Sequence, residues 1–168
     1  MPHDTIARFF LRLCACAAAL LAGPAGAVTI SEIHYHPPSG DEALEFVETA
    51  NETSTPADLS GWAFVEGIRF DFPAGTILGP RAYLVVARDA AALKARHGIA
   101  NVLGDFTGLL ENSGERITLA NQSGVPVVGV RYRDGGKWPA EADGAGHSIA
   151  LKGLRLDPEE PESWAKSP

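Results

Sequence analysis

The sequence Asp58-Leu59-Ser60-Gly61-Trp62 decides how this chain folds. Turn-forming residues precede it at 51–56, and short alternating runs follow it, of which Phe70-Asp71-Phe72 is the clearest. A polar turn beside a large aromatic residue and short alternating runs is typical of a small β module packed around a tryptophan. The stretch has no pattern of catalytic residues, so it predicts a fold and not an activity.

Outward from this stretch, alternation of apolar and polar residues predicts further strands. The expected strands are at 28–35, 44–50, 76–78, 83–87 and 148–151, with one hairpin turning at Glu66-Gly67 and another joining 116–120 to 125–132. Ile30 and Ile33 have opposite parity in the first strand, so it contains a bulge or is buried on both faces. In the second, we expect Leu44 and Phe46 to point inward.

A single helix is predicted, at residues 90–97. Asp89 is a good N-cap, Gly98 is a good residue to end the helix, and Ala92, Leu93 and Arg96 lie at helical spacing. The strand at 148–151 is expected to be the last, followed by an extended tail from which Trp164 can fold back onto the body. Many short strands with one short helix predict an all-β sandwich.

The first 27 residues are typical of a secretory signal peptide. Arg8 and Arg12 give a positive start, an apolar segment follows, and Ala25-Gly26-Ala27 is a small-residue cleavage pattern before Val28. The uninterrupted apolar part, 13–22, is shorter than the ~20 residues that span a bilayer, which favours a cleaved signal over a membrane anchor. We therefore expect a secreted or periplasmic protein, with one domain at 28–164 and a tail at 165–168.

Charge and cysteine content exclude several classes of function. Both cysteines lie in the signal peptide, so the mature chain of 141 of the 168 residues has no disulfide and no thiol chemistry. The formal charge of −7 becomes −8 once Asp4, Arg8 and Arg12 are removed. An acidic chain without a basic stripe argues against nucleic acid and against anionic membrane surfaces as partners.

Several segments along the mature chain carry a family resemblance. In order they are Ile30-Ser31-Glu32-Ile33-His34-Tyr35, Glu45-Phe46-Val47-Glu48 with Asn51, Asp58 to Trp62, Phe72 to Leu78, Tyr83 to Ala87, Asn112-Ser113-Gly114-Glu115-Arg116, and Asp143-Gly144-Ala145-Gly146-His147-Ser148-Ile149. In this ordered set the chain resembles the lamin tail domain in its bacterial secreted form, over 28–164. The resemblance implies an immunoglobulin-like β-sandwich and a non-catalytic module, often found beside other domains in large exported bacterial proteins. It brings no shared catalytic residues and no cofactor.

Two groups of side chains are candidate metal ligands. Glu32, His34 and His36 alternate along the first strand, so a regular strand would place them on one face, where they could bind Zn²⁺. No fourth ligand is spaced nearby, and a solvated strand face is the competing interpretation. A second, acidic group could offer oxygens to Ca²⁺, but its spacing matches no calcium motif and fits ordinary surface acidity; its members are Asp41, Glu42, Glu45 and Glu48.

Catalytic motifs are absent from the sequence. There is no nucleophile elbow, Ser113 lies in a turn, and Gly135-Gly136 lacks the context of a phosphate-binding loop. Among the tryptophans, Trp62 is expected in the core, whereas Trp138, in a Gly/Pro loop, is the best candidate for an exposed surface together with Tyr132.

The expected function is therefore an exported, non-catalytic β-sandwich that mediates interaction with an unidentified protein, glycan or cell surface. The alternative is an accessory or metal-binding domain of a secreted hydrolase or nuclease. Loops at the ends of the sandwich are the expected place for recognition.

Overall fold

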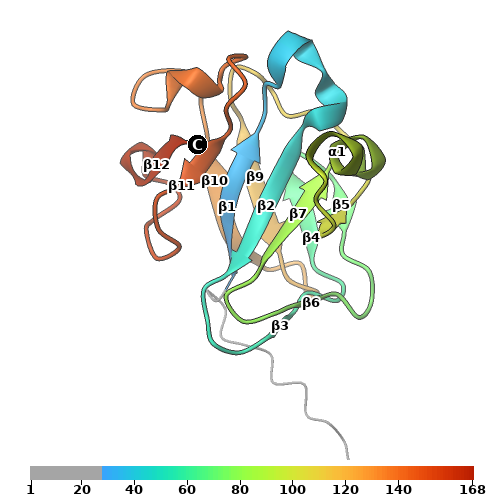
Figure 1. The fold of residues 1–168 in the computed structure, drawn as a ribbon. Coiled ribbons are helices and arrows are strands. Elements are labelled where there is room, and N and C mark those ends of the chain that lie inside the picture. Colours follow the sequence, from blue (N-terminus) through green and yellow to red (C-terminus); the bar gives the residue numbers. More distant parts are fainter. Residues whose placement is uncertain (1–27) are drawn as a thin grey trace, which may run out of the picture.

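A six-stranded and a four-stranded sheet pack face to face in the computed structural model of the chain, which describes residues 28–168 (Figure 1). The larger sheet has the order β12 (Trp164–Lys166), β11 (Ile149–Leu151), β1 (Val28–His34), β2 (Phe46–Asn51), β7 (Tyr83–Ala87), β8 (Val102–Leu103). The smaller sheet has the order β10 (Pro126–Arg131), β9 (Arg116–Ala120), β4 (Ala63–Glu66), β5 (Phe70–Asp71). The predicted signal peptide at 1–27 lies outside the described residues.

Short elements complete this all-β sandwich. The strands β3 (Ala57–Asp58) and β6 (Ile77–Leu78) pair at one end of it. Four 3₁₀ turns occur in the connections: η1 (Pro38–Gly40), η2 (Glu42–Leu44), η3 (Ala140–Ala142) and η4 (Pro161–Ser163). Within 28–168, no helix is both long enough and apolar enough to cross a membrane.

The first strand contains the bulge that its sequence requires. The pairing of β1 with β2 shifts register between Ile30 and Glu32, so Ser31 is the additional residue. As a result Ile30 and Ile33 both have no exposed surface and both belong to the core. After the bulge, Glu32 and His34 face outward, away from the smaller sheet.

The core between the sheets is closed by aromatic and aliphatic side chains from both. Tyr35, just after β1, stacks on Tyr132, just after β10, with ring centroids 4.8 Å apart, and both are fully buried. The prediction that Tyr132 lies on an exposed surface is therefore wrong. Its hydroxyl donates a hydrogen bond to the carbonyl of Glu111 at 2.9 Å, which satisfies its polar end inside the sandwich.

The predicted helix is present as α1 (Ala90–His97). The Asp89 side chain accepts a hydrogen bond from the amide of Ala92, and Gly98 ends the helix with φ of 67°. Leu93 packs with Ala87 and Val102 in a second, smaller apolar cluster on the outer face of the six-stranded sheet.

Phe46 also packs against this outer cluster, and Leu44 lies in η2 before the strand begins. The prediction that both point into the main core is wrong. Val47 and Thr49 point inward instead, because β2 begins two residues later than expected and its alternation is shifted.

The Asp58-Leu59-Ser60-Gly61-Trp62 stretch ties two loops together. The carboxylate of Asp58 accepts from the amide of Ser60 at 2.9 Å, and the Ser60 hydroxyl accepts from the amide of Gly75 at 2.9 Å. Leu59 is fully buried in the core, whereas Trp62 is half-buried and packs against the core from its margin. The core residue of this stretch is thus the leucine, and the expectation for Trp62 is only partly met.

The chain does not end in the predicted extended tail. After β11, residues return as β12, which pairs antiparallel with β11 and forms the edge of the larger sheet. Trp164, at the start of β12, packs on Trp138 with ring centroids 5.9 Å apart. Trp138 is only 6% exposed, so its predicted exposure is wrong: the Gly/Pro loop that carries it folds against β12.

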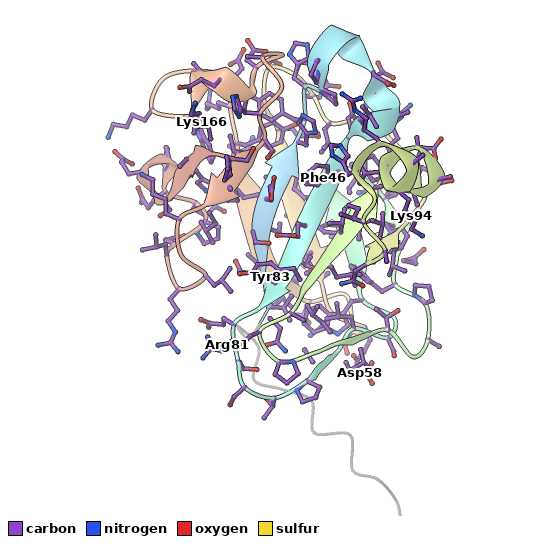
Figure 2. All side chains as sticks on the ribbon, in the orientation of Figure 1. Phe46, Asp58, Arg81, Tyr83, Lys94 and Lys166 are labelled. Atoms are coloured by element: carbon purple, nitrogen blue, oxygen red, sulfur yellow. The ribbon has the colours of Figure 1, made fainter. Side chains whose placement is uncertain are left out.

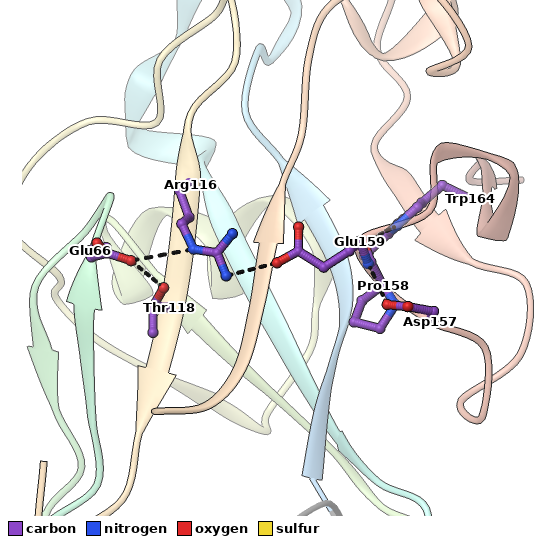
Figure 3. Close-up of polar contacts among 7 residues, drawn as sticks. All are labelled: Glu66, Arg116, Thr118, Asp157, Pro158, Glu159 and Trp164. Atoms are coloured by element: carbon purple, nitrogen blue, oxygen red, sulfur yellow. Dashed lines mark hydrogen bonds and ion pairs between the residues drawn. The ribbon is translucent and has the colours of Figure 1, made fainter. Parts of the chain in front are cut away.

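Polar contacts attach this C-terminal segment to the smaller sheet, as Figure 3 shows. The guanidinium of Arg116, on β9, lies 3.5 Å from the carboxylate of Glu66 and 2.7 Å from that of Glu159. Close to Glu159, the indole of Trp164 donates to the carbonyl of Pro158 at 3.0 Å. One arginine therefore links β4, β9 and the segment that leads into β12.

Candidate functional site

A groove of about 420 Å³ crosses the outer face of the six-stranded sheet. It lies between α1 on one side and the strands β11 and β12 on the other, and Figure 1 shows β1, β2 and β7 running between them. Outward-facing side chains of these strands form its floor: Glu32, His34, Phe46, Glu48, Tyr83 and Val85. This face is free of the second sheet, so the groove is open to a ligand.

Two carboxylates lie side by side on the floor. Glu32 of β1 and Glu48 of β2 are directly paired in register and share the outer face. Burial raises the pKa of Glu32, although Ser148 lowers it by donating a hydrogen bond. Burial also raises the pKa of Glu48, Ser31 lowers it by donating at 2.7 Å, and the charge of Glu32 raises it again. Like charges on opposed residues repel each other, so an empty groove is electrostatically unfavourable.

His34 is the third polar group of the floor. It is only 7% exposed, and its ring packs edge-on against Phe46 with centroids 5.3 Å apart. Burial lowers its pKa to about 4, His97 lowers it further, and a hydrogen bond to the Leu44 backbone opposes the shift. Its Nε2 atom is buried and has no hydrogen-bond partner within the described chain. A buried ring nitrogen without a partner is energetically costly unless something completes it.

Apolar surface borders these polar groups. Tyr83 is 46% exposed and Ile99, just after α1, is 39% exposed. Figure 2 shows Phe46 and Tyr83 on the open face of the sheet. A second hollow, of about 590 Å³, continues from the groove past α1 and shares His34, His97 and Gly146 with it. Polar groups in an open, partly apolar concavity are the usual composition of a binding site.

The structure separates the three predicted zinc ligands. Glu32 and His34 share the groove, but His36 lies beyond the end of β1, where its Nδ1 is 2.6 Å from the carboxylate of Asp143. Within residues 28–168, no three histidine, cysteine, aspartate or glutamate side chains are placed to hold a metal ion. The predicted strand-face alignment therefore holds only for the first two.

The predicted acidic group is also dispersed. Glu48 lies on the groove floor, Glu42 lies 3.6 Å from Arg88, and Asp41 is exposed between η1 and η2. Glu45 is 2% exposed and accepts a hydrogen bond from the amide of Leu110 at 3.1 Å. Burial raises its pKa to about 7. It borders a separate hollow of about 370 Å³ but is engaged in holding the 108–115 loop.

The Asn112-Ser113-Gly114-Glu115-Arg116 segment is structural. The Glu115 carboxylate accepts from the amide of Glu111 at 3.0 Å and closes the turn. Gly114 has φ of 101°, and a Cβ there would lie 2.4 Å from the carbonyl oxygen of Tyr132. This segment closes the loop over Tyr132 and contributes no chemistry.

The groove has no catalytic arrangement among the described residues. Ser148 donates to Glu32 and not to a histidine, so it lacks the base that activates a serine nucleophile. Two sandwiched sheets with a groove of this kind define an immunoglobulin-like domain. The chain matches the Lamin Tail Domain family over residues 22–134 and belongs to it. No curated protein matches the chain.

Sequence reasoning missed most of the groove. Ser148 and the Gly146 loop come from residues after the family match, and β11 brings them beside β1, 116 residues from Glu32 in the chain. Tyr83 was expected in a strand buried on both faces. The alternation of Glu32 and His34 was the one usable signal, and it indicated the correct face of β1.

Proposed function

We propose that this chain is an exported, non-catalytic binding module and that the groove between α1 and β11 is its binding site. The observation that supports it best is the unpartnered Nε2 of His34 on the floor of an open groove. Buried polar atoms are normally paired, and those that are not commonly mark a place where a ligand completes the bonding. The exposed apolar border, with Tyr83 and Ile99, adds the surface that such a ligand would cover.

The proposal places recognition on the sheet face and not on the end loops, where the sequence led us to expect it. Asp41 to Glu45 at one end are engaged in turns and in holding the 108–115 loop. At the other end, the Asp58 to Trp62 stretch is engaged with the loop at Gly75. The groove is the concave surface whose polar groups are left with bonding capacity.

The test is a titration of the purified, isotope-labelled protein with a panel of peptides, glycans and cell-wall fragments, followed by NMR. We expect resonances of β1, β2 and β7 to move with the ligand that binds. The double substitution Tyr83→Ala and Ile99→Ser should weaken that binding at least tenfold. Ile77→Ser is the matched control, because Ile77 is 52% exposed and does not line the groove. Binding that maps elsewhere, or that both variants leave unchanged, would refute the proposal.

Export forms the second part of the proposal, and it is supported by the charge, apolar and small-residue pattern of 1–27. Intact mass and N-terminal sequencing of the protein recovered from the extracytoplasmic fraction should give a chain that begins at Val28. Replacing Ala25 and Ala27 by Arg should block cleavage and leave a precursor with the full mass. A mature protein that retains residues 1–27 in the cytoplasm would contradict it.

A further inference from the structure

We propose that the groove binds the ammonium group of a lysine side chain presented by a partner protein. The inference rests on the proposed function, since it names the ligand of the same groove. It follows from the charge, the free bonding capacity and the shape of the floor.

The charge of the floor is negative and unopposed. Glu32 and Glu48 lie opposite each other, and neither takes part in an ion pair with a lysine or arginine of the described chain. The whole chain has a formal charge of −7, which attracts a cationic partner over longer distances. A cation between the two carboxylates removes their mutual repulsion and replaces the water that burial has taken from them.

Each carboxylate has one oxygen already occupied. Ser148 donates to Oε1 of Glu32, and Ser31 donates to Oε1 of Glu48. No other side-chain hydrogen bond within 28–168 reaches either carboxylate, so each has its Oε2 free. The serines also hold the two side chains in place, which lowers the entropy lost when a ligand binds.

His34 supplies a third acceptor. Its neutral ring carries one proton, and the hydrogen bond to the Leu44 backbone, together with the unpartnered Nε2, assigns that proton to Nδ1. Nε2 therefore has a free lone pair on the groove side of the ring. The ring cannot move away easily, because it is buried against Phe46.

Three single acceptors match an ammonium group better than the other common cations. An ammonium has three N–H donors around one compact charge, whereas a guanidinium presents a planar fork that suits both oxygens of one carboxylate. The separation of the ligands excludes a metal ion, since no three acidic or histidine side chains of 28–168 are placed for one. The apolar methylene stem of lysine can then lie along Phe46 and Tyr83.

The experiment titrates the purified protein with the peptide acetyl-Gly-Lys-Gly-amide and maps the NMR shifts. We expect the shifts to centre on Glu32, His34 and Glu48, including the Nε2 signal of His34. The same peptide with Nε-acetyl-lysine should bind at least tenfold more weakly, because acetylation removes the charge and two donors. The arginine peptide should also bind more weakly.

Matched variants test the floor itself. Glu32→Gln and Glu48→Gln keep the shape of each side chain and should each weaken lysine-peptide binding several-fold, and raising the salt concentration should weaken it in the unmodified protein. Glu141→Gln, at an exposed position on η3, is the control and should leave binding unchanged. Well-dispersed spectra of all three variants would establish that they are folded.

The outcomes separate this inference from the proposed function. Equal binding of the lysine and acetyl-lysine peptides overturns the ammonium assignment, and so does a glycan that occupies the groove when the lysine peptide does not; in both cases the groove remains a binding site. Cadaverine that binds as tightly as the peptide overturns a protein as the source of the amine. If no peptide, glycan or wall fragment moves the groove resonances, both proposals fail.

Discussion

Trp138 and Trp164 pack against each other with ring centroids 5.9 Å apart, and both are almost completely buried. One belongs to the loop after β10 and the other opens β12, so this contact fixes the C-terminal strands onto the sandwich. Because β11 and β12 form one wall of the groove, the tryptophan pair supports the candidate site without touching it.

Removing one ring of this pair should destabilise the whole domain. Trp138→Ala leaves a large cavity between the loop and β12, and such substitutions cost about 3–5 kcal/mol in free energy of unfolding. Urea unfolding followed by circular dichroism measures the change. The control is Ile77→Ala, at a side chain that is 52% exposed, which should change stability by less than about 0.5 kcal/mol. Equal losses in the two variants would contradict the packing role.

Gly114 should tolerate no side chain, because the obstacle is backbone. A Cβ at Gly114 would lie 2.4 Å from the Tyr132 carbonyl oxygen, and the φ of 101° is itself unfavourable for alanine. Gly124 also has a positive φ, of 74°, but open space around it. We expect Gly124→Ala to cost about 1–2 kcal/mol and Gly114→Ala to cost clearly more or to prevent folding. Thermal unfolding of both variants measures the difference, and similar melting temperatures would remove the steric argument.

Asn51 should not be replaceable by aspartate. Its Nδ2 donates to the carbonyls of Thr55, Leu78 and Gly79 at 2.8, 3.1 and 3.0 Å, and the residue has no exposed surface. Asn51→Asp turns this donor into a buried charge that faces carbonyl oxygens. A buried charge left without a partner costs about 3–5 kcal/mol.

Asn121 provides the matched control for this substitution. Its Oδ1 accepts from the amides of Ser123 and Val125, and an aspartate can do the same. Asn121→Asp should therefore keep the stability of the unmodified protein within about 0.5 kcal/mol in urea unfolding. A loss as large as that of Asn51→Asp would show that the donor bonds of Asn51 are not what matters.

Glu45 should make stability depend on pH in a defined direction. Burial raises its pKa to about 7 in the folded protein, above the value of 4.5 expected when unfolded, so the folded state holds the proton more tightly. Its stabilising contribution is complete below pH 4.5 and is lost as the pH rises through 7. Glu45→Gln cannot titrate, so its stability relative to the unmodified protein should rise between pH 4.5 and 8. Urea unfolding at several pH values measures this difference.

The comparison must be made as a difference because other groups titrate too. Burial lowers the pKa of His34 to about 4, which removes stability as the pH falls through 6.5 towards 4, the opposite direction. That contribution is the same in both proteins and cancels. Glu141→Gln controls for the loss of a surface carboxylate, and a constant difference between Glu45→Gln and the unmodified protein across this pH range would contradict the prediction.

Local patterns were enough to predict much of the fold. The helix at 90–97 was readable because a cap, a stop and its spacing agree, and the hairpin at 116–132 because two apolar runs flank a turn. The parity conflict of Ile30 and Ile33 correctly indicated a bulge. These features depend on residues close together in the chain, and a single sequence contains that information.

Features that depend on distant pairing were not predictable. Trp138 lies among Gly and Pro residues, which indicates exposure, and only its contact with Trp164 buries it. Ser148 reaches Glu32 because β11 pairs with β1, and nothing in either segment specifies that choice of neighbour. The groove was therefore missed, although the outward direction of Glu32 and His34 was correctly anticipated.

The single additional residue at Ser31 also limits how this domain can change in length. Deleting it would restore strict alternation, and either Ile30 or Ile33 would rotate from the core to the outer face while Glu32 and His34 lost their common direction. Insertions and deletions are thus confined to connections such as the turn at Asn121 to Gly124, where added residues meet only solvent. Any relative that keeps both this core and this groove is expected to keep β1 at the same length, even where its loops differ.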